Sequence, residues 1–227
     1  IVYAMRCGFY GGNPLKMVQE DFPVLKPTFF PSVPRLYNRI YGLIKSRIEG
    51  LTGCRKWLAT KALDTKMRNL KATGQVTHGC FDKLVFNKMR ALLGGNIRLM
   101  STGSAPISGE VVDFIKVCFC CPFVEGYGLT ESSAASFSQI PGDMTSGNIG
   151  GPVANVKLRL RDIPEMNYHS TSSPPQGEIL LWGTSVMEGY FKNEEKTKEA
   201  FLGDWFLTGD VGEVADNGSV RIIDRAK

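Results

Sequence analysis

The chain has 227 residues, of which 43% are hydrophobic and 22% are charged, and its formal net charge is +5. These fractions are those of an ordinary globular protein and argue against the disordered, collagenous and coiled-coil classes. Lysine and arginine are scattered among the acidic residues instead of forming a basic block, so we expect no nucleic-acid partner.

Cysteine usage indicates no disulfide framework and no zinc site. The six cysteines are Cys7, Cys54, Cys80, Cys118, Cys120 and Cys121. The last three crowd into one apolar stretch, which is not a disulfide spacing. The two histidines, His78 and His169, supply no second ligand pair for zinc. We therefore interpret the cysteines as buried thiols.

No apolar run reaches the ~18 residues that a membrane-spanning helix needs. The best candidate, residues 111–124, is short and contains Lys116. The chain opens at Ile1 inside a continuing pattern, without an initiator methionine, so we expect both ends to be truncations of a longer protein.

The first 150 residues alternate amphipathic helices with short apolar strands. The predicted helices span residues 15–25, 35–48, 56–71, 81–93 and 108–118, and Gly94-Gly95 ends the fourth of them. The predicted strands span residues 28–30, 97–100 and 122–125. This alternation predicts an α/β fold, with a parallel sheet flanked by helices and ligands at the carboxyl ends of the strands.

After Gly151 the pattern changes to alternating strands with one short helix at residues 194–201. The strands centre on residues 156–160, 179–181 and 220–222. The sequence Asp216-Asn217-Gly218 predicts a tight two-residue hairpin, because Asn-Gly supplies positive φ angles. We predict an α/β subdomain over residues 1–150 and a smaller β-rich, barrel-like subdomain over residues 151–223.

The segment from Gly126 to Glu131 carries several groups that suit a nucleotide. Gly126 and Gly128 let main-chain amides approach a ligand, and Tyr127 can stack on a purine. Thr130 can hydrogen-bond a phosphate oxygen, and Glu131 can hold Mg²⁺. The alternative is an ordinary turn with a helix cap and a surface glutamate.

Three further segments stand out. Thr208-Gly209-Asp210 places a carboxylate at a predicted strand end, where it can accept both hydroxyls of a ribose or simply close a turn. Residues 177–183 alternate as a core strand, and we assign them, together with Gly189-Tyr190-Phe191, to the scaffold. Asp224-Arg225 taken alone is a surface ion pair.

The order and spacing of these segments resemble the acyl-adenylate-forming superfamily over essentially the whole chain. The segments that resemble its long-chain fatty acyl-CoA synthetases are Pro34–Arg39, Gly103–Pro106, Glu125–Glu131, Pro141–Asp143, Gly177–Ile179 and Trp205–Asp210. The sequence departs from that branch at three positions. Asp204 stands where the branch commonly has Gly, Leu207 where it has His or Arg, and Ala226 where it has Lys.

The resemblance implies roles for the nucleotide-facing residues. The loop Gly103-Ser104-Ala105-Pro106 and Tyr127 would frame adenine, next to the backbone of Gly126 and Gly128. Thr130 and Glu131 would be the catalytic residues, with Thr130 on the α-phosphate and Glu131 binding Mg²⁺.

The resemblance also implies how the C-terminal end works. Asp210 would hold the ribose hydroxyls and Arg225 would reinforce it. Residues 224–227, ending in Lys227, would begin the hinge to a C-terminal lid domain that this chain lacks, together with an upstream phosphate loop, so we expect the fragment to be inactive alone.

The implied reaction is ATP-dependent activation of a long-chain fatty acid, through an acyl-adenylate, to acyl-CoA. The implied partners are the fatty acid, ATP, coenzyme A and Mg²⁺, with peripheral membrane association and a location in the cytoplasm or on the cytoplasmic face of an intracellular membrane. The alternatives are a medium-chain or aromatic-acid CoA ligase of the same superfamily, and a non-catalytic acyl- or nucleotide-binding protein.

Overall fold

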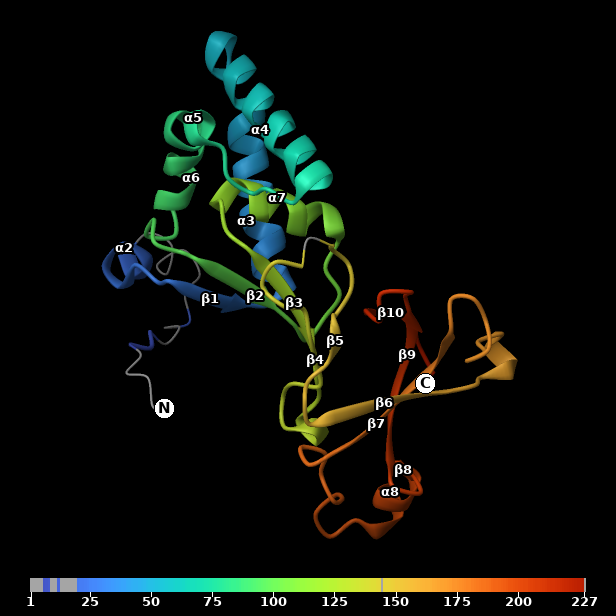
Figure 1. Ribbon diagram of the computed structural model, residues 1–227. Helices are drawn as coiled ribbons and strands as arrows, with labels where there is room; N and C mark the ends of the chain where they lie inside the picture. Colours follow the sequence, from blue (N-terminus) through green and yellow to red (C-terminus); the bar gives the residue numbers. More distant parts are fainter. Residues whose placement is uncertain (1–5, 9–11, 13–19, 144, 227) are drawn as a thin grey trace. The chain divides into compact units, whose positions relative to one another are not determined.

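The computed structural model describes residues 6–8, 12, 20–143 and 145–226 (Figure 1). The chain forms two compact units. Unit 1 comprises residues 1–31, 35–100 and 110–123, and unit 2 comprises residues 32–34, 101–109 and 124–227. The chain therefore passes between the units several times.

The helices of the first 120 residues follow the predicted pattern. They are α2 (Phe22–Leu25), α3 (Pro34–Glu49), α4 (Gly53–Thr73), α5 (Gly79–Phe81), the π-helical turn η2 (Asp82–Phe86), α6 (Asn87–Ala91) and α7 (Gly109–Phe119). The predictions at residues 35–48, 56–71 and 108–118 are confirmed. The helix predicted at residues 81–93 exists but contains the π-helical turn, and most of the one predicted at residues 15–25 lies outside the described residues.

The first sheet is built from β1 (Phe29–Ser32), β2 (Leu99–Thr102), β3 (Phe123–Tyr127), β4 (Phe137–Ser138) and β5 (Gly151–Pro152), in that order. The last two strands pair antiparallel with their neighbours, so the sheet is mixed and not purely parallel. The strand predicted at residues 28–30 exists as β1, at one end of the strand order. Its successive side chains differ in burial, because Phe29 is 50% exposed and Phe30 is buried.

A buried tyrosine and a buried lysine organise the core of unit 1. The Tyr37 hydroxyl donates to the Phe30 carbonyl oxygen at 2.7 Å. The Lys66 ammonium, which has no exposed surface, donates to an Asp82 carboxylate oxygen at 2.6 Å and to the Val117 carbonyl oxygen at 2.7 Å. Because the Tyr37 hydroxyl and the Lys66 ammonium both have partners, these two buried polar groups can be accommodated in the core.

The second sheet confirms the predicted β-rich region. It contains β6 (Val156–Arg161), β7 (Gln176–Gly183), β8 (Phe201–Leu202), β9 (Trp205–Val214) and β10 (Val220–Arg225), with the helix α8 (Glu194–Glu199) before β8. The strand order is β10-β9-β7-β6, with β8 on β9, and every pairing is antiparallel. Its core includes Ile179, Leu181, Phe206 and Val220. The sheet curls into a half-barrel.

The hairpin between β9 and β10 differs from the prediction of a two-residue connection. Ala215 N–H donates to the Ser219 carbonyl oxygen, which leaves the three residues 216–218 as the loop. Of these three, only Gly218 has a positive φ, 81°. The Asn217 side-chain oxygen instead accepts from Ser219 N–H and fixes the turn, so this is a three-residue loop with glycine in the left-handed position.

Cysteine burial is also only partly as predicted. Cys118 and Cys121 are buried, and burial raises the pKa of the Cys121 thiol to about 12. Cys7, Cys54 and Cys80 are exposed, so the prediction of buried thiols is wrong for them. They lie outside the apolar stretch that carries the other three. Among the described residues, no helix is both long enough and apolar enough to cross a bilayer.

Candidate nucleotide site

The segment that follows β3 is held in one tight conformation. β3 ends at Tyr127, and the 3-10 helix η3 (Thr130–Ser132) begins three residues later. A side chain at Gly128 would place its Cβ 1.5 Å from the Ala134 carbonyl oxygen, so only glycine fits there. Thr130 is exposed at the start of η3, and Glu131 is half-buried behind it. The loop therefore presents a hydroxyl and a carboxylate on a fixed backbone.

Asp210 does not lie at a strand end or in a turn, as the sequence suggested, but inside the ten-residue strand β9. The pairing of β9 with β7 slips there, from Leu180 opposite Leu207 to Glu178 opposite Val211. Residues 208–210 therefore form a β-bulge, and Gly209 adopts a φ of 73°. The bulge interrupts the regular alternation of side chains, which is why a pattern of alternating residues could not locate it.

The two predicted motifs meet at a hydrogen bond. The Tyr127 hydroxyl donates to Asp210 Oδ2 at 2.6 Å, although 83 positions separate the residues. Burial and the Asp210 carboxylate both raise the pKa of Tyr127, so the phenol stays protonated and remains a donor. Arg225, on β10 directly opposite Asp210, lies 3.4 Å from Asp210 Oδ1 through its Nε atom. Asp210 thus has one half-buried neutral donor and one exposed cation as partners.

Glu131 has a partner that the sequence analysis missed. The Tyr190 hydroxyl donates to Glu131 Oε1 at 3.0 Å, and Met187 N–H donates to the Glu131 carbonyl oxygen at 2.7 Å. Burial and the Glu131 carboxylate raise the pKa of Tyr190. The sequence analysis assigned residues 189–191 to the scaffold. The one feature of the sequence that could have indicated a role for Tyr190 is an aromatic residue directly after a loop glycine, Gly189.

The loop after β2 lies against the same strand end. An added Cβ at Gly103 would come 3.1 Å from the Gly126 carbonyl oxygen, so the two glycines approach closely. Ser104 adopts a φ of 70°, and Ser104, Ala105 and Pro106 are exposed. All the predicted site residues belong to unit 2. Lys227, predicted to lie at the hinge, is outside the described residues.

A hard cation bound at Glu131 would have few protein ligands. In the part of the chain that the structure describes, no group of three or more His, Cys, Asp or Glu side chains gathers around one point. Mg²⁺ usually keeps several waters and binds through one or two carboxylates together with substrate phosphates. A single carboxylate such as that of Glu131 fits this mode and does not fit an all-protein metal cage.

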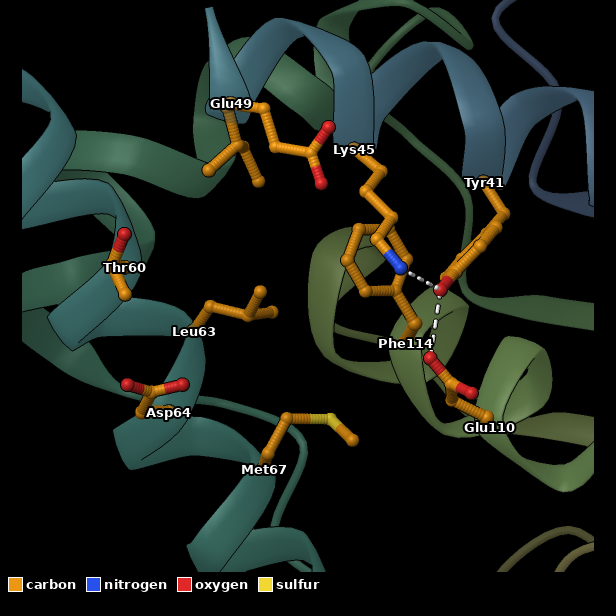
Figure 2. Close-up of a pocket in the computed structure, with 10 residues that line it drawn as sticks. Tyr41, Lys45, Glu49, Thr60, Leu63, Asp64, Met67, Glu110 and Phe114 are labelled. Atoms are coloured by element: carbon orange, nitrogen blue, oxygen red, sulfur yellow. Dashed lines mark hydrogen bonds between the residues drawn. The ribbon is translucent and has the colours of Figure 1, made fainter. Parts of the chain in front are cut away.

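Unit 1 contains a hollow of about 300 Å³ between α3, α4 and α7, lined by none of the predicted site residues. Figure 2 shows Leu63 and Met67 of α4 pointing into it and a chain of polar groups on its other side. In that chain Lys45 donates to the Tyr41 hydroxyl at 2.8 Å, and Tyr41 donates to Glu110 Oε1 at 2.7 Å. The hollow is therefore separate from the residues that the motifs single out.

The fold is that of adenylation domains. A carboxylic acid reductase adenylation domain from Segniliparus rugosus, solved in complex with AMP and a co-purified carboxylic acid, matches with a TM-score of 0.65 and 26% identity. The match covers 93% of this chain and 29% of that one. The corresponding domain from Mycobacterium chelonae matches with a TM-score of 0.69 and 25% identity, covering 93% and 29% of the two chains.

The sequence comparisons define the family. The model described as "AMP-binding enzyme" matches residues 1–191, and the chain belongs to this family. It is 44% identical over 222 residues to long chain acyl-CoA synthetase 7, peroxisomal, of Arabidopsis thaliana, covering 97% of this chain and 31% of the relative. It is 40% identical over 223 residues to long-chain-fatty-acid–CoA ligase 5 of Rattus norvegicus, covering 98% and 32%. The chain thus spans about a third of the length of these relatives.

Proposed function

We propose that the full-length protein containing this chain activates a long-chain fatty acid with ATP and transfers the acyl group to coenzyme A. Membership of the AMP-binding family and the names of the similar relatives support this reaction. The observation that carries the proposal is the hydrogen bond between Tyr127 and Asp210, because it joins the two motifs that would have to share one nucleotide.

In this proposal Asp210 accepts hydrogen bonds from the two ribose hydroxyls. Its carboxylate has more acceptor positions than Tyr127 and Arg225 occupy, so it can bind further donors. The loop Gly103–Pro106 and the Tyr127 ring would border adenine. Arg225, whose side chain is 80% exposed, would hold the outer carboxylate oxygen in place.

The chemistry begins with a fatty carboxylate, which is a poor acyl donor. Its oxygen attacks the α-phosphorus of ATP, the bond to the bridging oxygen breaks, and diphosphate leaves; the coenzyme A thiolate then attacks the acyl carbon and AMP leaves. Negative charge grows on the phosphate oxygens in the first step, so a donor such as the exposed Thr130 hydroxyl stabilises it. Glu131 would hold Mg²⁺, which neutralises phosphate charge when bound.

The remaining parts of the proposal concern organisation. Residues 1–150 would form the α/β subdomain, residues 151–223 the β-rich subdomain and residues 224–227 the start of the hinge. The strands from β6 to β10 form one antiparallel sheet, which supports the proposal of a separate β-rich subdomain. Loss of activity in the isolated chain and peripheral membrane association, which would suit a lipid substrate, complete the proposal.

The test is exchange of labelled diphosphate into ATP by the full-length protein, with hexadecanoate, octanoate and benzoate as competing acids. We expect exchange that depends on hexadecanoate and Mg²⁺. Asp210→Asn should abolish most of it, whereas Asp204→Asn, at an exposed position before β9, should not. Preference for octanoate or benzoate would replace the substrate class, and no exchange with any acid by the folded protein would refute the reaction.

A further inference from the structure

A buried glutamate lies directly beneath the bulge that carries Asp210. Glu178, the third residue of β7, is 2% exposed, and its Oε1 accepts a hydrogen bond from Gly209 N–H at 3.1 Å. Its other oxygen, Oε2, forms an ion pair with the Arg161 guanidinium on the neighbouring strand β6. Burying a carboxylate is costly unless its oxygens have partners. Here the Gly209 amide and the Arg161 guanidinium are those partners.

The bulge itself has few other attachments. The Thr208 hydroxyl donates to the Ile179 carbonyl oxygen at 2.7 Å and accepts from Asp210 N–H at 3.1 Å. The Gly209 carbonyl oxygen accepts from Ala226 N–H at 2.8 Å. The amide of Gly209, however, faces β7 in a place where the regular ladder is interrupted, and Glu178 provides its acceptor.

The direction of the Asp210 side chain depends on the two peptides that flank Gly209, and the Gly209 N–H belongs to the first of them, between Thr208 and Gly209. Gly209 adopts a left-handed φ, so rotation of the Thr208–Gly209 peptide would change the direction in which the chain continues into Asp210. A side chain at Gly209 would meet no atom within 4 Å, so packing around the glycine does not restrain it. The hydrogen bonds from neighbouring groups must therefore set its orientation.

We infer that Glu178 is a positioning residue for nucleotide binding, which holds the Thr208–Gly209 peptide at the start of the bulge so that the Asp210 carboxylate faces the Tyr127 hydroxyl and the ribose hydroxyls. This inference rests on the proposed function, because it assigns Asp210 to the ribose. The essential feature is the acceptor at Oε1, and the ion pair with Arg161 holds the carboxylate in place. The sequence analysis assigned Glu178 to the scaffold.

The acceptor and the charge can be separated by two substitutions. Glu178→Gln keeps a side-chain oxygen that reaches Gly209 N–H and loses the ion pair, while Arg161, whose side chain is 42% exposed, can turn towards water. Glu178→Asp keeps the charge and the ion pair but withdraws the acceptor by one methylene, beyond hydrogen-bond distance of Gly209. Glu213→Ala is the matched control, because Glu213 also accepts across the β7–β9 pair, from Gln176, away from the bulge.

The measured quantity is the ratio of the dissociation constants for 2′,3′-dideoxy-ATP and ATP in the full-length protein. A role in general sheet stability would weaken both nucleotides equally and leave the ratio unchanged. We expect Glu178→Asp to lower the ratio about tenfold, by weakening ATP alone, because it removes the orientation of a charged acceptor. Glu178→Gln should keep the ratio within about twofold of the unmodified protein, and Glu213→Ala should not change it.

Asp210→Ala separates failure of this inference from failure of the proposed site. If Asp210→Ala lowers the ratio to near one while Glu178→Asp leaves it unchanged, the positioning role is wrong. The same conclusion follows if Glu178→Gln lowers the ratio and Glu178→Asp keeps it, since the charge and not the acceptor would then matter. If Asp210→Ala leaves the ratio unchanged, Asp210 does not bind the ribose and the proposed function loses its central contact.

Discussion

Replacing Tyr127 by phenylalanine removes the hydroxyl that donates to Asp210 and preserves the ring. The Tyr127 hydroxyl donates to Asp210 Oδ2 at 2.6 Å, and the Asp210 side chain is only 11% exposed. A hydrogen bond to a charged group contributes about 1.5–3 kcal/mol, and the exposed Arg225 contributes little in compensation. We therefore expect Tyr127→Phe to lower the free energy of unfolding by about 1.5–3 kcal/mol.

The measurement is equilibrium unfolding in urea, followed by circular dichroism. With a slope of about 2 kcal/mol per molar urea, the midpoint should fall by about 1 M. The control is Tyr168→Phe, which deletes the same group from an exposed bond to Asp224 at 3.1 Å and should change the free energy by less than about 0.5 kcal/mol. Equal losses in the two variants would refute the reasoning, because the burial of Asp210 would then have no effect.

The remaining predictions concern pH, backbone and core. Burial and Asp210 raise the pKa of Tyr127 above its ordinary value of 10.0. The stabilisation by the Tyr127 hydroxyl is therefore complete below pH 10 and is lost as the pH rises further. Above pH 10 the urea midpoints of the unmodified protein and Tyr127→Phe should converge. Gly128→Ala should destabilise the protein more than Gly209→Ala, because the added Cβ at Gly128 would lie 1.5 Å from a carbonyl oxygen. At Gly209 the added Cβ meets no atom, and the cost is only the strain of a positive φ, about 1–2 kcal/mol. Thermal unfolding that gave the reverse order would contradict this prediction. Lys66→Ala should cost about 3–5 kcal/mol in urea unfolding by leaving Asp82 without its buried cation, and a loss below 1 kcal/mol would contradict it.

Local pattern selected the residues of the proposed site and predicted most of the elements around them. The amphipathic spacing of α3, α4 and α7 and the alternation in β6, β7 and β10 are properties of short windows, so their helices and strands could be predicted within a few residues. The glycine-rich segment ending in Thr130-Glu131 and the Thr208-Gly209-Asp210 segment were likewise recognisable from residue type and order alone.

The tertiary structure alone decided how those segments act on one another. The bulge in β9, the hydrogen bond between Tyr127 and Asp210 and the buried support from Glu178 each depend on the register of strands that are distant in sequence. The partnership of Glu131 with Tyr190 is of the same kind. A local pattern records only the direction of successive side chains along one strand, whereas register is fixed by the packing of several strands together, and for that reason the sequence could name Asp210 but not show what orients it.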